Sequence, residues 1–305
     1  MGKGIECPPV MICGFNRPDY LREVFGRVRE AKPSRLFLVL DAPRDNHPED
    51  ISRYNECRNI FNQVDWECDV YRDYAERNLG CRRRMESGIS NVFRFVEECI
   101  ILEDDCVPHL DFFRFCGEML CRYKDDCRIG MVAGFREHPY LRVRTESYYF
   151  TRFTQIWGWA TWKRAWKCYG KVLPKWDIDK ARIALEPIFR EKALVERVLG
   201  WFDDACYGRS NSWATVWWMT NVFENFLTIH PSVNMVTNIG GVGCHNTKFN
   251  PEFHNVRSVG LKWPLVHPEF IMPDAIDEAI VRKRMAPRVS LKQLVVFFMR
   301  KLGLR

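Results

Sequence analysis

The sequence lacks an apolar stretch that is long enough to cross a lipid bilayer. Its longest uninterrupted apolar run covers residues 294–299, whereas a spanning helix needs about 20 predominantly apolar residues in a row. The N-terminal residues also lack the basic-then-apolar order and the small-residue cleavage site of a secretory signal. We therefore expect a cytoplasmic protein that has no membrane-spanning segment.

The sequence also lacks a Cys-x-x-Cys pair, although it contains 13 cysteines. That spacing is common in structural zinc sites and in redox motifs. The number of cysteines is odd, and several of them, such as Cys13 and Cys99, lie in apolar stretches. Buried, reduced thiols that act as small hydrophobic side chains are therefore favoured over a disulfide framework. A cysteine-rich structural or metal-storage scaffold stays open as an alternative class of protein.

Acidic residues are absent from residues 279–305, which contain eight Lys and Arg residues. The preceding 278 residues hold 38 basic and 39 acidic side chains, so the net charge of +7 comes from the C-terminal end. This distribution argues against a core that binds nucleic acid. We therefore expect no nucleic-acid partner.

Residues 274–305 are predicted to form a basic amphipathic tail. A helix that begins at Ser290 would place five apolar side chains on one face: Leu291, Leu294, Val295, Phe298 and Leu302. Such a helix is typical of segments that bind the surface of an anionic membrane, which would make the protein peripheral to the inner face of a membrane. The alternative is that this apolar face packs on the protein's own core, and the sequence leaves both open.

Short apolar runs alternate with helix-like patterns in the first part of the chain. Four runs are predicted to be strands, namely residues 10–15, 36–40, 68–71 and 99–102. Helices are predicted after an Asn16 cap and Pro18, near residues 48–50, over about 83–98, and through Phe112, Phe113, Phe115 and Met119. Strands that alternate with helices in this way predict an α/β fold with a largely parallel sheet.

The alternation weakens after residue 134, where tryptophans become frequent. Short strands are expected to mix with helices near residues 160–169, 180–200 and 213–226. Within this part, Trp162 and Trp166 have helical spacing and are expected to lie in the core. We therefore divide the chain into residues 1–134, residues 135–273 and the tail, with the second part elaborating the same sheet.

Acidic side chains follow the most apolar predicted strand. Glu103, Asp104 and Asp105 come directly after residues 99–102, and Asn16 with Arg17 and Asp41 follow two other predicted strands. Because ligands of open α/β sheets bind outside the carboxyl ends of the strands, these side chains are candidates for one site. Carboxylates suit Mg²⁺ or Mn²⁺, and an arginine suits phosphate oxygens. A solvated acidic turn, a helix cap at Asn16 and a turn at Asp41 remain open as alternatives.

Several short motifs occur in an order that resembles nucleotide-sugar glycosyltransferases of the GT-A type. The closest similarity is to the N-acetylglucosaminyltransferase I group and its bacterial-type relatives, and it covers about residues 8–247. The motifs that carry the resemblance are Phe15-Asn16-Arg17-Pro18, Leu40-Asp41, Asn78-Leu79-Gly80, residues 101–108 around Glu103-Asp104-Asp105, Phe112-Phe113, Ile156-Trp157-Gly158-Trp159-Ala160 and Asn238-Ile239-Gly240.

The resemblance implies a GT-A-like mixed sheet with the nucleotide-sugar-binding half in residues 1–134 and the acceptor-side half in residues 135–273. It implies that Asp105 is the direct ligand of a divalent metal, Mn²⁺ or Mg²⁺, with Glu103 and Asp104 beside the ribose and the donor sugar. His245 follows a glycine-rich bend and is a second candidate for a metal ligand.

The same resemblance places Asn16, Arg17 and Asp41 near the nucleotide. It also implies that Trp159 belongs to a wall that packs under the donor or acceptor sugar. These assignments apply only at positions where this sequence matches the motifs of the family.

One position departs from the family pattern. Relatives are expected to carry an acid, the general base, just after a tryptophan in the segment that here reads residues 212–217, but position 214 is alanine. Asp203 or Asp204 in the preceding loop is the replacement that we consider, with Asp204 favoured. A shifted alignment or a loss of transfer activity would also explain Ala214.

The sequence therefore predicts a metal-dependent glycosyltransferase. The expected reaction moves a sugar from a nucleotide diphosphate donor to a hydroxyl of a glycan or glycolipid. A catalytically inactive nucleotide-sugar-binding protein is the alternative. The expected partners are the donor, the acceptor and, through the tail, an anionic membrane surface.

Overall fold

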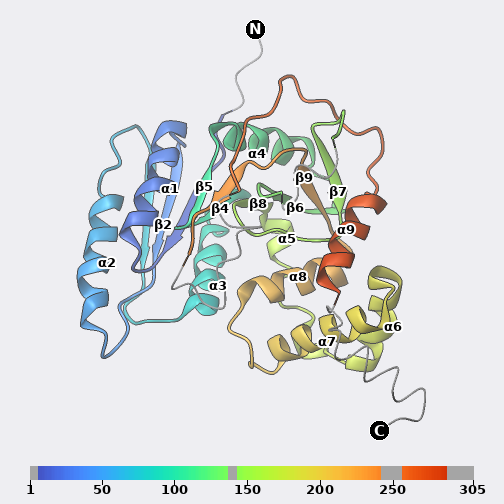
Figure 1. Cartoon of the computed structure of the whole chain (residues 1–305). Helices are drawn as coiled ribbons and strands as arrows, with labels where there is room; N and C mark the ends of the chain where they lie inside the picture. The colour runs from blue at the N-terminus through green and yellow to red at the C-terminus, as the bar shows by residue number, and fades with distance from the viewer. Residues whose placement is uncertain (1–5, 137–142, 242–255, 287–305) are drawn as a thin grey trace.

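The computed structural model describes residues 6–136, 143–241 and 256–286. An eight-stranded sheet forms its centre, in the order β3-β2-β1-β4-β8-β6-β9-β7 (Figure 1). Four strands from the start of the chain are mutually parallel: β1 (Val10–Gly14), β2 (Arg35–Leu40), β3 (Asp69–Tyr74) and β4 (Glu98–Glu103). All four predicted strands are therefore present, and their carboxyl ends lie at one edge of the sheet.

The other half of the sheet is mixed in direction. Its strands are β6 (Ile129–Ala133), β7 (Tyr148–Thr151), β8 (Trp159–Trp162) and β9 (Leu227–Pro231). Strand β8 is antiparallel to both β4 and β6, β6 is parallel to β9, and β7 is antiparallel to β9. A second, two-stranded sheet pairs β5 (Cys106–Pro108) with β10 (Val236–Asn238). The predicted α/β fold with a mixed sheet, mostly parallel in its N-terminal half, is confirmed.

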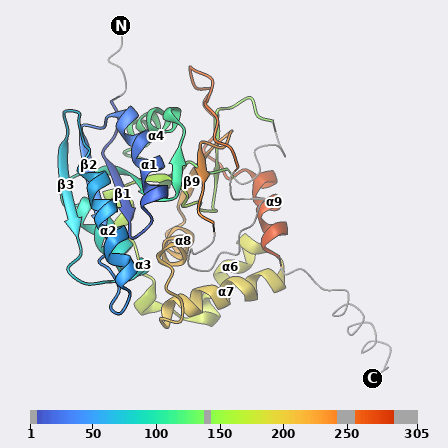
Figure 2. The same ribbon diagram turned by 60° about the vertical axis from the view of Figure 1, so that its left-hand side comes forward.

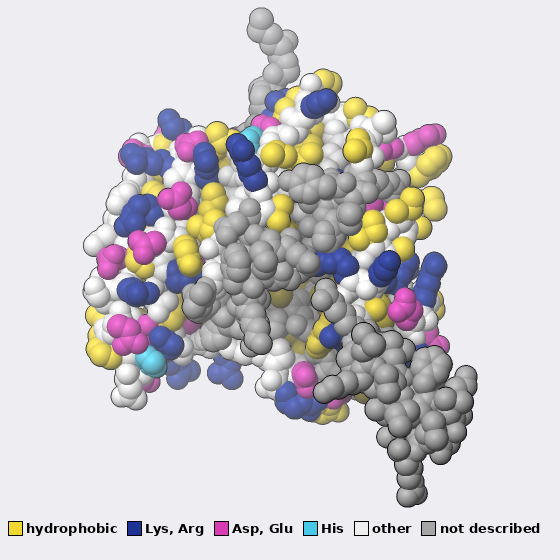
Figure 3. All heavy atoms as spheres, viewed as in Figure 1, with side chains coloured by type: hydrophobic (Ala, Val, Ile, Leu, Met, Phe, Trp, Pro, Cys, Tyr) yellow, Lys and Arg dark blue, Asp and Glu magenta, His cyan; other side chains and the backbone are white. Residues whose placement is uncertain are grey.

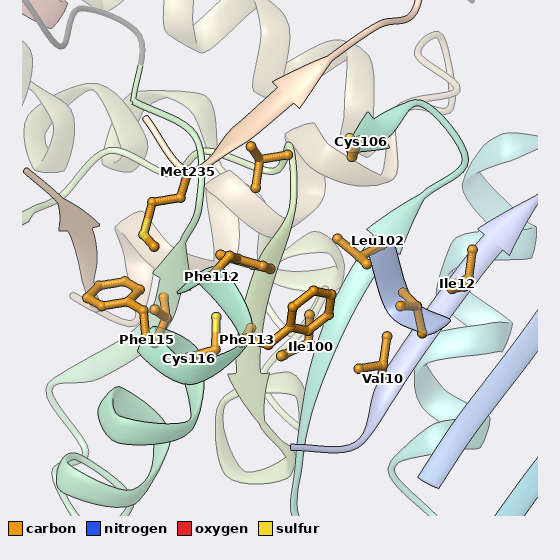
Figure 4. Packing of buried hydrophobic residues seen from close by; sticks show 14 of the residues in the cluster. Val10, Ile12, Ile100, Leu102, Cys106, Phe112, Phe113, Phe115, Cys116 and Met235 are labelled. Atoms are coloured by element: carbon orange, nitrogen blue, oxygen red, sulfur yellow. The ribbon is translucent and has the colours of Figure 1, made fainter. Parts of the chain in front are cut away.

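Helices cover both faces of the sheet because successive strand residues point to opposite sides. Val10 and Ile12 pack in a cluster with α1 (Pro18–Ala31), α2 (Pro48–Phe61) and α4 (Leu110–Arg122). Figure 4 shows part of this packing around Phe112 and Phe115. Met11 instead packs in a second cluster with α3 (Cys81–Val92), α5 (Lys163–Trp166) and α8 (Trp213–Phe223).

Two further helices lie together beside α8, as Figure 2 shows. They are α6 (Ile178–Phe189) and α7 (Lys192–Cys206), which follow a short 3-10 turn at Leu173–Lys175. With α8 they enclose an apolar cluster of their own that includes Leu185, Val198 and Phe202. The division of the chain at residues 134 and 273 stays a prediction.

Helix α9 (Ala275–Met285) packs next to β7 through a group of ion pairs. We call this group the α9 cluster, and its described members are Arg136, Arg144, Arg152, Asp274, Asp277, Glu278 and Arg282. Arg144 lies 2.9 Å from Asp274, and the Nε atom of Arg152 donates to Glu278 at 2.9 Å. The cluster therefore joins the end of the described chain to the edge of the large sheet.

Two predictions about helix boundaries are wrong. The helix expected over about residues 83–98 ends at Val92. Phe93 and Val96 are buried and extend the apolar pattern, but the backbone after Val92 forms a turn. The N-cap of α1 is Arg17, without a side-chain capping bond, because Asn16 binds another helix instead.

The surface and the cysteines fit a folded protein with reduced thiols. Basic and acidic side chains are interspersed over the region of α1 and α2 on the face seen in Figure 3. Every cysteine within the described ranges is free. No helix in those ranges is both long and apolar enough to cross a membrane.

Candidate functional site

The predicted site residues at the strand ends lie at one edge of the sheet. Gly14, the last residue of β1, stands between the neighbouring strands: a Cβ atom there would lie 3.4 Å from Leu40 and 3.5 Å from the Cβ of Asp104. The backbone N–H of Asp41 donates to the carbonyl of Gly14 at 3.2 Å. The ends of β1, β2 and β4 therefore meet closely, as the parallel register requires.

Arg17 joins two of the predicted acids directly. Its Nε donates to Oδ2 of Asp104 at 3.2 Å, its Nη2 donates to Oδ1 of the same carboxylate, and its Nη1 donates to Oδ2 of Asp105 at 2.9 Å. The side chains of Asp104 and Asp105 are 3% and 11% exposed, whereas that of Arg17 is 25% exposed. We call Arg17, Glu103, Asp104 and Asp105 the strand-end cluster.

Acids outnumber the arginine in the strand-end cluster, and this affects their protonation. Burial and the neighbouring charge of Asp105 together raise the pKa of Glu103 to about 8, although Arg17 acts in the opposite direction. Burial also raises the pKa of Asp104, against the opposing effect of Arg17. Burial and mutual repulsion therefore disfavour the charged forms of these carboxylates, and Arg17 partly offsets that effect.

The two-stranded sheet closes one side of the cluster. The backbone N–H of Ile239, just after β10, donates to the carbonyl of Asp105 at 2.9 Å, and Cys106 donates its thiol proton to Oδ1 of Asp105. A Cβ atom at Gly240 would lie only 2.4 Å from Oδ2 of Asp105. A side chain at position 240 would therefore displace the Asp105 carboxylate or the backbone beside it.

Asp41 clamps a loop. Its carboxylate accepts hydrogen bonds from the backbone N–H groups of Ala42, Leu79 and Gly80 at 3.0, 2.8 and 2.9 Å. Burial raises the pKa of Asp41, and these three hydrogen bonds oppose that rise. Asp41 thus fixes the loop that leads into α3 against the end of β2. Its carboxylate shapes the edge of the sheet, and its predicted contact with a nucleotide stays a prediction.

Asn16 contacts Asp50, which was not predicted to be a site residue. Its Nδ2 donates to Oδ1 of Asp50 at 2.6 Å, and Asp50 also accepts from Nε of Arg44 at 2.7 Å. The hydrogen bonds from Arg44 lower the pKa of Asp50 to about 2. No local pattern could have shown this group, because Asn16 and Asp50 are 34 residues apart.

Trp159 lies in the core. Its side chain is 0% exposed and packs in the cluster on the α3 and α8 face of the sheet. The ring stacks on Trp213 at 5.6 Å between centroids and lies 5.5 Å from Trp217. The Trp159 ring is therefore buried between the sheet and the helices on that face. Trp162 and Trp166 are also buried, as expected.

Asp204 lies on a helix, which corrects the expectation of a loop. Asp203 and Asp204 belong to the last turns of α7, and both pair with Arg209, with the Nε of Arg209 2.7 Å from Asp204. The Asp204 side chain is 48% exposed.

The end of α7 also lies beside the start of α3. Arg82 donates to the carbonyls of Ala205 and Ser210 at 3.1 and 3.3 Å, and a Cβ at Gly80 would lie 3.6 Å from the Asn211 amide. The segment after Asp204 thus borders the loop that Asp41 clamps.

His245 lies outside the described residues, as does the part of the tail from residue 287 onward. Their predicted roles as metal ligand and membrane contact stay predictions.

The described residues do not fit a ready-made divalent metal site at Asp105. Mg²⁺ takes six oxygen ligands, of which one or two are usually protein carboxylates and the others are waters and substrate phosphates. Both oxygens of Asp104 and Oδ2 of Asp105 are engaged by Arg17, and Gly240 lies against the same Asp105 oxygen. No group of three His, Cys, Asp or Glu side chains within the described ranges is arranged to hold a metal ion.

Comparisons with known proteins do not assign the chain to a family. No known protein family matches the sequence, and no curated protein matches it. The similarity to the N-acetylglucosaminyltransferase I group therefore stays a prediction.

Among solved structures, three similar chains illustrate the level of likeness. HddC from Yersinia pseudotuberculosis is 13% identical with a TM-score of 0.26, over 41% of this chain and 64% of that one. The chain thus spans less than two thirds of HddC. The 4-diphosphocytidyl-2C-methyl-D-erythritol synthase from Anaerococcus prevotii is 11% identical, with a TM-score of 0.32 over 55% and 78% of the two chains. UDP-glucose pyrophosphorylase in complex with UDP-glucose is 8% identical, with a TM-score of 0.32 over 54% and 80%.

Proposed function

We propose that the protein is a glycosyltransferase that uses a nucleotide diphosphate sugar, and that the donor binds at the edge formed by the ends of β1, β2 and β4. The observation that supports this most strongly is the strand-end cluster. It combines an arginine that is held by two carboxylates with the carboxyl edge of a parallel sheet. Ligands of open α/β sheets bind at such edges.

The reaction needs neutralisation of the departing diphosphate, a fixed position for the anomeric carbon, and a base at the acceptor hydroxyl. Arg17 supplies a positive charge that is independent of pH. It also immediately precedes α1, a helix of 14 residues, whose N-terminal end carries a partial positive charge. Both features favour an anionic group in front of Arg17.

The other predicted residues take different positions in this proposal. Asn16, Asp41 and Glu103 shape the edge around the nucleotide, and Asp104 orients Arg17. No direct sugar contact is assigned to Trp159, because its side chain has no exposed surface. A divalent metal at Asp105 is expected from the resemblance, but Arg17 engages Oδ2 of Asp105, so no step of the proposal depends on a metal.

Asp204 is the proposed base for the acceptor hydroxyl. It is about half exposed, and the segment that follows it borders the loop before α3. The proposed acceptor is a glycan or a glycolipid, and a glycolipid would agree with a tail that binds an anionic membrane surface.

One observation favours the inactive nucleotide-sugar-binding protein as the second candidate. Ala214 lies in the first turn of α8 and packs against the tryptophan cluster around Trp159. Alanine has no acidic group, so this position does not supply the base. An active enzyme therefore depends on another acid, and Asp204 is the one that we test.

The first experiment measures binding by isothermal titration calorimetry, with the full chain and a panel of UDP, GDP, ADP, CDP and dTDP. We expect at least one of these nucleotides to bind, and Arg17→Gln to weaken its binding by at least about tenfold, because charge-assisted hydrogen bonds contribute about 1.5–3 kcal/mol. Arg22→Gln removes an exposed arginine from the same helix and is the matched control. Absence of binding for the whole panel would contradict the proposal.

The second experiment follows hydrolysis and transfer of the matching nucleotide sugar. Asp204→Asn should reduce turnover by about 100-fold to 10,000-fold, which is the usual contribution of a general base, and leave nucleotide affinity unchanged. Asp203→Asn is the control, because Asp203 pairs with the same arginine. Donor binding without any turnover by the wild-type protein would establish the inactive binder instead.

A further inference from the structure

A cavity lies at the edge of the sheet opposite to the strand-end cluster. Its volume is about 900 Å³, and it is bounded by the beginnings of β2 and β4, by the residues just before β1 and by the second half of α4. Pro8, Pro9, Phe95 and Val96 supply apolar parts of its wall. Pockets that bind small molecules usually have this size, a largely apolar wall and a few polar groups. The amino edge of the sheet therefore has room for a ligand of its own.

One carboxylate in the cavity wall has no partner. Glu98 is the first residue of β4 and is partly buried, and no hydrogen bond or ion pair joins it to another residue in the described part of the chain. Ile100, two positions further on, packs in the same apolar cluster as α4, so Glu98 faces that side of the sheet as well. Its carboxylate is thus directed to the side on which the cavity lies.

The surroundings of Glu98 leave its charge only weakly compensated. Burial raises the pKa of Glu98, and the positive charge of Lys124 opposes that rise only in part. A partly buried carboxylate without a hydrogen-bond partner is costly, and a cation placed against it lowers that cost. A positively charged group of a ligand would therefore be stabilised at this position.

The other charged groups of the wall favour a cation in the same way. Four acids and two arginines line the cavity, namely Glu6, Glu97, Glu98, Glu118, Arg35 and Arg122. Glu97 pairs with Lys163 at 2.8 Å, and Arg35 lies 3.7 Å from Asp69. The acids thus outnumber the arginines in the wall, and this excess attracts a cation and repels an anion.

We propose that this cavity binds a small apolar compound that carries a positively charged amino group. The ammonium group lies against the Glu98 carboxylate, where it forms a charge-assisted hydrogen bond. The apolar body packs against Pro9, Phe95 and Val96, which removes its surface from water. The donor site proposed above lies at the carboxyl ends of the strands, so this inference does not depend on the proposed function.

Cys121 provides a local readout of binding, because it is exposed and lines the cavity. Cys127 is exposed as well but does not line the cavity, so it is the internal control. The full chain is treated with iodoacetamide at pH 7.5 and increasing amounts of 2-phenylethylamine, and alkylation of both cysteines is followed by peptide mass spectrometry. At about ten times the dissociation constant, alkylation of Cys121 should slow about tenfold while that of Cys127 is unchanged. Absence of this protection up to about 20 mM amine would overturn the inference.

Two comparisons test the contact with Glu98. The uncharged 2-phenylethanol has the same apolar body, and it should require an at least about tenfold higher concentration than the amine for equal protection of Cys121. Glu98→Gln should weaken protection by the amine to a similar extent, and Glu23→Gln, which changes an exposed acid of α1, should behave as the wild type does. Equal protection by amine and alcohol, or an unchanged response of Glu98→Gln, would overturn the inference. If Glu98→Gln fails to fold, the comparison of amine and alcohol on the wild-type protein still decides.

Discussion

The strand-end cluster and the α9 cluster are built from the same types of side chain, arginines and acids, but they have different roles. Around Arg17, three acids face one arginine that is a quarter exposed. In the α9 cluster, four arginines face three acids among the described residues; the side chain of Arg152 is also 25% exposed, and that of its partner Glu278 is 1% exposed. The α9 cluster joins parts of the fold, whereas the strand-end cluster lies at an edge of the kind where open α/β sheets bind ligands.

Their positions in the fold support the same distinction. The strand-end cluster lies where three parallel strands end and where α1 begins. The α9 cluster instead joins α9 to β7, the outermost strand of the sheet. Perturbing each cluster should therefore change a different property of the protein.

The largest expected effect is on stability, from Glu278→Ala. Removing this carboxylate takes one partner from both Arg152 and Arg282, and breaking a buried ion pair costs about 3–5 kcal/mol of unfolding free energy. Urea denaturation measures the loss, and nucleotide affinity should stay unchanged.

Glu30→Ala is the control, because Glu30 pairs with Arg27 on the exposed side of α1. Its effect should be below about 1 kcal/mol, as for other surface pairs. If Glu278→Ala were equally mild, the α9 cluster would not hold the fold as described.

The second effect concerns pH and again belongs to the α9 region. His230 is buried beside Tyr149, and its ring N–H donates to the carbonyl of Phe153. Burial lowers the pKa of His230 from 6.5 to about 4. The unfolded chain therefore gains a proton below pH 6.5 that the folded protein accepts only near pH 4, so stability falls as the pH falls through this range.

The loss should reach about 3 kcal/mol, because each pKa unit corresponds to about 1.4 kcal/mol. Urea denaturation at several pH values, with His230→Gln as the comparison, measures the part that this histidine contributes. Identical pH profiles for the two proteins would show that His230 does not titrate in this way.

A smaller effect sharpens the description of the strand-end cluster. Gly240→Ala would place a Cβ at 2.4 Å from the Asp105 carboxylate, whereas at Gly241 the nearest atom is the Tyr20 hydroxyl at 3.8 Å. Crowding of this kind costs about 1–3 kcal/mol, so Gly240→Ala should destabilise the protein and weaken nucleotide binding, while Gly241→Ala should do neither. Thermal unfolding and calorimetry on the two variants make the comparison, and equal behaviour would mean that the backbone at 240 can move away.

The sequence was most informative where the structure depends on local patterns. The four parallel strands, the helices that follow them and the position of residues 103–105 at a strand end could be predicted, because apolar periodicity is a local property. The pairing of Arg17 with Asp104 could not be predicted, because 87 residues separate them.

Other features depended on contacts that no local pattern reveals. Trp159 follows a glycine in a motif that suggested a sugar contact, but its ring completes a tryptophan cluster formed with α8. Similarly, the α9 cluster joins residues from 136–152 with residues from 274–282. In both cases the side chain contacts residues that are distant in the sequence, and these contacts bury it.

The central claim is that the diphosphate of the nucleotide binds Arg17 at the strand-end cluster. The most direct measurement is a crystal structure of the full chain with the best-binding nucleotide diphosphate in EDTA. We predict diphosphate oxygens within about 2.7–3.2 Å of the Arg17 guanidinium, in front of the ends of β1 and β4. A nucleotide bound elsewhere, with Arg17 in contact only with Asp104 and Asp105, would contradict the account.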